Sequence, residues 1–70
     1  MEHKYSVIQA FKATEPISGR ERQFGPGEIV LFHTGQAGST ITIEVDSSLY
    51  LVERSIFKTC CRFKNEGSLA

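Results

Sequence analysis

The chain has 70 residues, with eight Lys and Arg against eight Asp and Glu, and its formal net charge is zero when the histidines are neutral. This length limits it to one domain, and a composition of 40% hydrophobic and 23% charged residues excludes a disordered chain. A neutral chain has no overall field that attracts nucleic acid or an anionic membrane. Residues 1–5 lack the apolar run of a signal peptide and no stretch reaches the length of a membrane span, so we expect a cytoplasmic protein without a membrane partner.

Residues 4–13 predict the first strand. They are rich in Val, Ile and aromatic side chains, which favour extended backbone. Their partial alternation places Ile8 and Ala10 on one face and Val7 and Phe11 on the other.

A long loop and a second strand follow. Residues 14–27 contain both prolines and three of the glycines, which predicts a loop anchored by Phe24. Residues 28–34 form a short and nearly continuous apolar run between two glycines, which predicts a strand with His33 near its end.

The cleanest strand signal lies over residues 40–46. Apolar and polar side chains alternate there, so we expect Ile41, Ile43 and Val45 to face the core. A short hairpin connection then leads to a fourth strand over residues 49–53.

The last elements are a turn and a fifth strand. Residues 54–57 are too few for a typical helix and suit one turn of 3₁₀-helix, and residues 58–63 read as extended. We therefore predict a single domain over residues 1–64, followed by a frayed tail at residues 65–70.

Three segments resemble SH3 domains. Residues 8–11 and 21–30 are similar to the opening strand and the diverging turn of that family, and residues 52–57 are similar to the stretch before its last strand. The resemblance implies an all-β fold, a five-stranded SH3-like barrel with a long first loop and a 3₁₀ turn before the last strand. It also implies that Ile8 and Ala10 lie in the core, which leaves Val7 and Phe11 on the opposite face.

The resemblance does not extend to the peptide-binding groove of that family. SH3 domains bind proline-rich peptides with a groove of aromatic side chains and a proline. At the matching positions this chain has Lys12 and Thr14 for two tyrosines, Glu53 for the proline and Ile56 for a later tyrosine, and it contains no Trp. A PxxP peptide is therefore not the expected ligand.

No catalytic or metal-binding pattern is present in the sequence. Cys60 and Cys61 are adjacent in a segment predicted as extended, so we expect one thiol buried, the other exposed, and no disulfide between them. Only His3 and His33 join them as strong metal ligands, without a C-x-x-C motif. We expect no cofactor, no metal and no enzyme activity, with an active site assembled between subunits of an oligomer as the alternative.

Surplus apolar side chains favour a non-catalytic protein-interaction module as the leading hypothesis. The residues that alternate against the predicted core, and so form the predicted interaction face, are Val7, Phe11, Leu31 and Leu51. Exposed together they would form a patch that soluble monomers seldom carry. A partner protein or a second copy of the chain would cover it, and self-association would also stabilise a small core.

Basic and aromatic residues in the last third of the chain suggest an alternative ligand. They are Arg54, Phe57, Lys58, Arg62, Phe63 and Lys64. Small β-barrels bind single-stranded nucleic acid with aromatic side chains on a basic track, so this function is the alternative hypothesis. Glu53 and Glu66 flank the segment, and a neutral chain gains little from counterion release.

Overall fold

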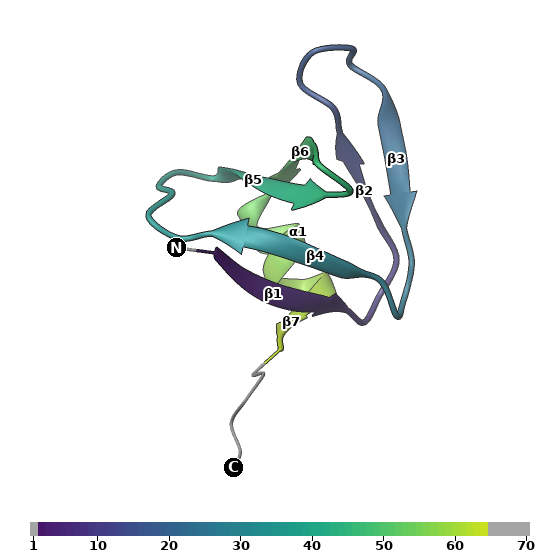
Figure 1. Ribbon diagram of the computed structural model, residues 1–70, viewed down its shortest axis with the longest axis vertical. Helices are drawn as coiled ribbons and strands as arrows, with labels where there is room; N and C mark the ends of the chain where they lie inside the picture. The colour runs from purple at the N-terminus through teal and green to yellow at the C-terminus, as the bar shows by residue number, and fades with distance from the viewer. Residues whose placement is uncertain (1, 65–70) are drawn as a thin grey trace.

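The computed structural model describes residues 2–64, which form an all-β domain with one short helix (Figure 1). The elements in chain order are β1 (Glu2–Val7), β2 (Phe11–Thr14), β3 (Glu21–Phe24), β4 (Ile29–His33), β5 (Thr40–Val45), β6 (Ser48–Glu53), α1 (Arg54–Cys60) and β7 (Cys61–Phe63). The strands form one antiparallel sheet in the order β3-β2-β6-β5-β4-β1-β7.

This architecture confirms the all-β prediction and shows that the five-stranded barrel was wrong. The sheet has seven strands and runs from an edge at β3 to an edge at β7, which are not neighbours in the strand order of the described residues. In Figure 1, β2 and β3 stand apart as a hairpin, while α1 lies behind β1, β4 and β5. The predicted frayed tail at residues 65–70 lies outside the described residues.

The predicted first strand is interrupted after Val7. The carbonyl of Cys60 accepts hydrogen bonds from the backbone N–H groups of Ile8 and of the next residue, at 2.7 and 3.2 Å, and the chain turns there. Val7 and Phe11 both enter the core, at 1% and 6% exposure, whereas Ile8 and Ala10 are exposed. The predicted grouping of these residues into two faces holds, but the core lies on the face of Val7 and Phe11, so the predicted inside and outside were reversed.

Part of the predicted long loop forms a second strand of a hairpin. β3 pairs with β2 in a register that sets Phe11 opposite Phe24 and Thr14 opposite Glu21. Phe24 is completely buried, and its ring stacks on that of Phe11 with a centroid distance of 5.1 Å. The strand escaped prediction because its four residues include only one apolar side chain between turn-forming stretches.

Helix α1 replaces the predicted 3₁₀ turn and shortens the last strand. Phe57 and Cys60 lie three positions apart, so one helix face carries both into the core, where they are 4% and 6% exposed. This burial stabilises a second helical turn that the sequence pattern did not reveal. Cys61 begins β7 and is also buried, so the expectation of one exposed thiol was wrong as well.

β4, β5 and β6 form a meander whose central strand agrees with its prediction. Ile41, Ile43 and Val45 are buried. Asp46 and Ser47 connect β5 to β6 with positive φ angles of 52° and 66°. Two such residues are typical of the type I′ turn, whose twist matches that of the flanking strands.

The core contains only apolar and cysteine side chains among the residues whose burial is described. Its members are Val7, Phe11, Ala13, Phe24, Val30, Ile41, Ile43, Val45, Val52, Phe57, Cys60 and Cys61. No polar or charged side chain in this described part is buried. Groups able to recognise a polar ligand therefore lie at the surface.

Candidate functional site

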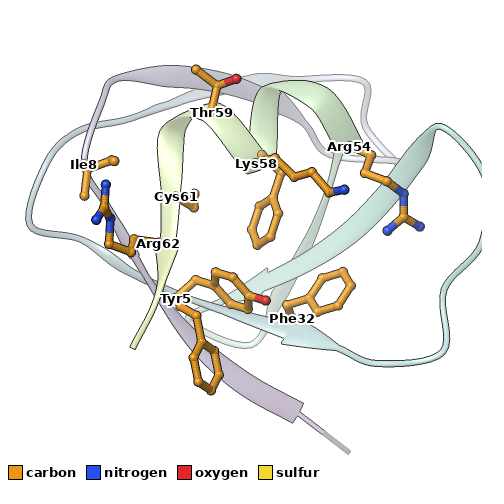
Figure 2. A pocket seen from close by; sticks show the side chains of 10 residues that line it. Tyr5, Ile8, Phe32, Arg54, Lys58, Thr59, Cys61 and Arg62 are labelled. Carbon is orange, nitrogen blue, oxygen red and sulfur yellow. The ribbon is translucent and has the colours of Figure 1, made fainter. Parts of the chain in front are cut away.

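A pocket of about 440 Å³ opens between β1, β4, α1 and β7 (Figure 2). Each of these elements contributes one aromatic ring: Tyr5, Phe32, Phe57 and Phe63. Three cations also line the pocket, namely Arg54, Lys58 and Arg62, and Ile8, Thr59 and Cys61 complete its wall. The described lining contains no carboxylate, so the pocket is apolar at its floor and positive at its rim.

Tyr5 lies at the centre of the aromatic cluster. Its ring centroid lies 4.7 Å from that of Phe57, 5.5 Å from Phe63 and 5.8 Å from Phe32. The β1–β7 register sets Tyr5 directly opposite Phe63, and the rings of Phe32 and Phe57 stack at 5.4 Å. Such pairs contribute about 0.5–1.5 kcal/mol each beyond the burial of their surface, so the pocket floor is well ordered.

The aromatic cluster is sealed on one side and open on the other. Phe57 is 4% exposed and belongs to the core, whereas Tyr5 and Phe32 are half-buried. Phe63 is 48% exposed. Figure 2 shows the hydroxyl of Tyr5 pointing into the pocket. This cluster would therefore offer a ligand aromatic surface and the hydroxyl group of Tyr5.

Lys58 and Arg62 supply charge that the described chain does not neutralise. Both side chains are exposed, and neither forms a hydrogen bond or ion pair with another of residues 2–64. Glu53 lines an adjacent hollow together with Arg54 and Lys58. Although the whole chain is neutral, this rim concentrates positive charge beside apolar walls, where fields act strongly.

Arg54 has a different role from the other two cations. Its Nε and NH2 groups donate hydrogen bonds of 2.8 Å to the carbonyls of Gly38 and Gln36, in the loop between β4 and β5. The Gln36 amide in turn accepts from the backbone N–H of Thr42 at 2.7 Å and donates to its carbonyl at 2.9 Å. Arg54 therefore anchors this loop, while its neutral partners leave its charge uncancelled.

Cys61 and Thr59 are the thiol and the aliphatic hydroxyl in the described lining of the pocket. Burial, with a further contribution from neighbouring Cys60, raises the pKa of the Cys61 thiol to about 12. A neutral thiol is a poor nucleophile, so Cys61 acts at neutral pH as an apolar part of the wall. The Thr59 hydroxyl donates to the Ser55 carbonyl at 3.0 Å, inside α1.

The structure brings together most of the basic residues named for the nucleic-acid alternative. Arg54, Lys58 and Arg62 line one pocket, whereas Lys64 follows β7 and is not among the lining residues. Sequence reasoning missed Tyr5 and Phe32, which come from β1 and β4. Only the pairing of β1 with β4 and β7 places them here, and local patterns do not contain that information.

The predicted apolar interaction face does not form as a unit. Val7 and Phe11 are core residues, which corrects the expectation that they lie opposite the core. Leu31 and Leu51 do lie on the outer face of the sheet, since their strand neighbours Val30 and Val52 are buried, but both are half-buried.

The outer face is a mixture of apolar and polar side chains. Ile29 and Leu49 are its exposed large apolar residues, at 38% and 47%. Glu44 lies between Leu31 and Leu49 in the strand register, and its Oε1 is 3.0 Å from Nε2 of His33. This ion-pair geometry interrupts what would otherwise be a continuous apolar surface.

No protein-family model, no curated protein and no solved structure matches this chain. The resemblance to SH3 domains therefore stays a prediction, as does the cytoplasmic location. Helix α1 has seven residues, and residues 2–64 contain no helix with the length and apolar character needed to cross a membrane. Residues 2–64 also bring no three His, Cys, Asp or Glu side chains into a group that could hold a metal ion.

Proposed function

We propose that this domain is a non-catalytic binding module whose pocket takes an anionic ligand with an aromatic or apolar group. The observation that carries the proposal is the pair of unneutralised cations, Lys58 and Arg62, beside an open aromatic cluster. Binding sites commonly combine an apolar floor with a few polar groups that orient the ligand. The aromatic group of such a ligand would pack against Phe63, and its negatively charged group would pair with Lys58 and Arg62.

An anionic aromatic dye, 8-anilinonaphthalene-1-sulfonate, provides a direct test of the pocket. Its fluorescence should rise on binding, and the affinity of the double variant Lys58→Glu/Arg62→Glu should fall at least tenfold. Lys12→Glu/Arg20→Glu is a matched control, because it makes the same change in net charge at exposed positions outside the pocket lining. The control should keep the affinity within about twofold, the change expected from long-range screened charge alone.

Equal losses of affinity in the two double variants would contradict the proposal, because the dye would then respond to net charge alone. Circular dichroism and the midpoint of urea unfolding establish that each variant is folded. The substituted side chains are exposed, so both variants should fold like the parent protein.

A second candidate is association with a protein through the outer face of β4, β5 and β6. The exposed Ile29 and Leu49, with the half-buried Leu31 and Leu51, support it. Sedimentation equilibrium should then show a dimer or larger species that Leu49→Glu dissociates. If the protein is a monomer at millimolar concentration, this face does not mediate self-association, and the prediction of a homo-oligomer is wrong.

A further inference from the structure

We infer that the ligand of the pocket is single-stranded nucleic acid, with a base against Phe63 and Tyr5 and backbone phosphates at Lys58 and Arg62. The inference rests on the proposed binding function of this pocket and adds the class of ligand to it. It uses the aromatic rings that the fold brings together with the basic residues of α1 and β7.

Phe63 offers the surface that a base requires. Tyr5 and His3 each lie 5.5 Å from its ring and meet it edge to face, at 67° and 74°. These contacts fix the orientation of the ring, yet Phe63 remains 48% exposed. Stacking of one base on a protein aromatic ring is worth about 1–3 kcal/mol and tolerates any base, because each has a flat π-face.

The cations are arranged for an extended anion rather than a single charged group. Arg54, Lys58 and Arg62 recur at four-residue intervals, the first two on successive turns of α1 and the third on β7. Figure 2 shows them spread across the pocket, with Arg62 and Arg54 on opposite sides and Lys58 between them. A nucleic-acid backbone presents charges in such a row, and a compact anion does not.

The recessed position of the aromatic rings favours a single strand over a duplex. Phe57 and Phe32 lie at the floor of the pocket, and the bases of a duplex remain paired and stacked inside the helix. An acidic peptide could pair with Lys58 and Arg62, but its carboxylates supply no aromatic ring to stack on Phe63. The aromatic half of the site therefore distinguishes these ligands.

The salt dependence of binding follows from Lys58 and Arg62, whose side chains have no partner in the described chain. If Lys58 and Arg62 each neutralise one phosphate, the logarithm of the binding constant should fall with the logarithm of salt concentration with a slope of about −1.4. Lys58→Gln and Arg62→Gln should each reduce the steepness by about 0.7. Lys12→Gln, outside the pocket lining, should leave the slope unchanged.

The decisive experiment compares four probes by fluorescence anisotropy at fixed salt: a ten-nucleotide oligothymidylate, an abasic oligomer of the same length, inorganic polyphosphate and a poly-glutamate peptide. Oligothymidylate should bind at least tenfold more tightly than the other three. Phe63→Leu should remove that advantage and leave binding of the abasic oligomer within twofold. A base stacked on Phe63 contributes only with its planar ring in place, whereas phosphate contacts survive the change.

The outcomes separate this inference from the proposal on which it rests. If the peptide, the polyphosphate or the abasic oligomer binds as tightly as oligothymidylate, the nucleic-acid inference is overturned while the pocket remains a binding site for anions. If oligothymidylate binds but Lys12→Glu/Arg20→Glu weakens it as much as Lys58→Glu/Arg62→Glu, the assigned site is wrong. If neither the dye nor any of these probes binds, both proposals fail.

Discussion

The domain contains two clusters of aromatic rings, each with an arginine beside it. They differ in whether acidic side chains neutralise the neighbouring positive charge. One consists of Phe11, Phe24 and Tyr50 with Arg22 above them, and we term it the sealed cluster. The centroids of the Phe24 and Tyr50 rings lie 5.3 Å apart. The guanidinium carbon of Arg22 lies 4.7 Å from the centroid of the Phe24 ring. The other is the pocket around Tyr5, where Phe63 is half exposed.

Charge balance separates the two clusters. Glu28 neutralises Arg22 with an N–O distance of 3.1 Å, and Asp46 approaches the same guanidinium at 4.0 Å. A hydrogen bond with the Tyr50 side chain and then the charge of Glu28 raise the pKa of Arg22. Lys58 and Arg62 have no such acidic partner in the described chain. Similar residues thus complete the fold in one place and remain available to a ligand in the other.

The largest expected contrast lies in the response of the two clusters to loss of an aromatic ring. Phe24→Ala should lower the free energy of unfolding by about 3–5 kcal/mol, because a completely buried ring leaves a cavity. Phe63→Ala should cost less, about 1–2 kcal/mol, since its ring is half exposed and its loss removes the edge contacts with Tyr5 and His3. Urea unfolding followed by circular dichroism measures both. Equal costs would show that the pocket is as much part of the core as the sealed cluster.

Cys61 links the pocket wall to the core, and its titration should affect stability at high pH. Its pKa in the folded protein is about 12, above the ordinary value of 9.0, so the folded state holds the proton more tightly. The stabilisation is complete below pH 9 and is lost as the pH rises towards 12, because the unfolded thiol ionises first.

Urea midpoints measured between pH 7 and pH 11 should therefore fall more steeply for the parent protein than for Cys61→Ala. The lysines and tyrosines titrate in both proteins, so the difference between the two curves reports the thiol. Parallel curves would mean that Cys61 is accessible to water, and that the wall between pocket and core is open there.

Glu28→Gln tests whether the ion pair between Glu28 and Arg22 stabilises the sealed cluster. Glu28 also accepts a hydrogen bond of 2.8 Å from the backbone N–H of Gly25, which orients the turn before β4. The change should cost about 1 kcal/mol, since the ion pair is partly exposed and glutamine retains the shape. An additional Arg22→Met substitution should cost less in the Glu28→Gln background than alone. Additive costs in this double-mutant cycle would show that the pair is not coupled.

The smallest effect is expected at the pocket rim. Lys58→Gln and Arg62→Gln should each change the free energy of unfolding by less than about 0.5 kcal/mol, because neither side chain has a partner among the described residues. Urea unfolding again provides the measurement. A loss above 1 kcal/mol at either position would give that cation a structural role and weaken the contrast with Arg22.

Sequence patterns predicted those parts of the fold whose signals are local. The alternation over residues 40–46 specified both the strand and its buried face, since the environment in a half-buried strand repeats every two residues. The interruption after Val7 was not predictable in this way. It depends on the carbonyl of Cys60, more than fifty residues later along the chain. The second turn of α1 likewise depends on the core that receives Cys60.

In the candidate site, too, the residues that are close in sequence were predictable and those brought together by strand pairing were not. Arg54, Lys58 and Arg62 were evident as a basic segment because they are close in sequence. Tyr5 and Phe32 were not, since strand pairing alone brings them to that segment. Val7 and Phe11 were assigned to the wrong face because alternation separates two faces without showing which of them meets the core, and that depends on distant parts of the chain.

The pairing of β1 with β7 also sets the order of events during synthesis. Tyr5 leaves the ribosome early, but Phe63, the residue directly opposite it, emerges only after the whole meander and α1. β4, β5 and β6 are joined by short connections and can pair while translation continues, whereas the contact between β1 and β7 is among the slow, non-local ones. The pocket is therefore complete only after β7 has been synthesised, and a nascent chain that lacks β7 has neither Arg62 nor Phe63 in its lining.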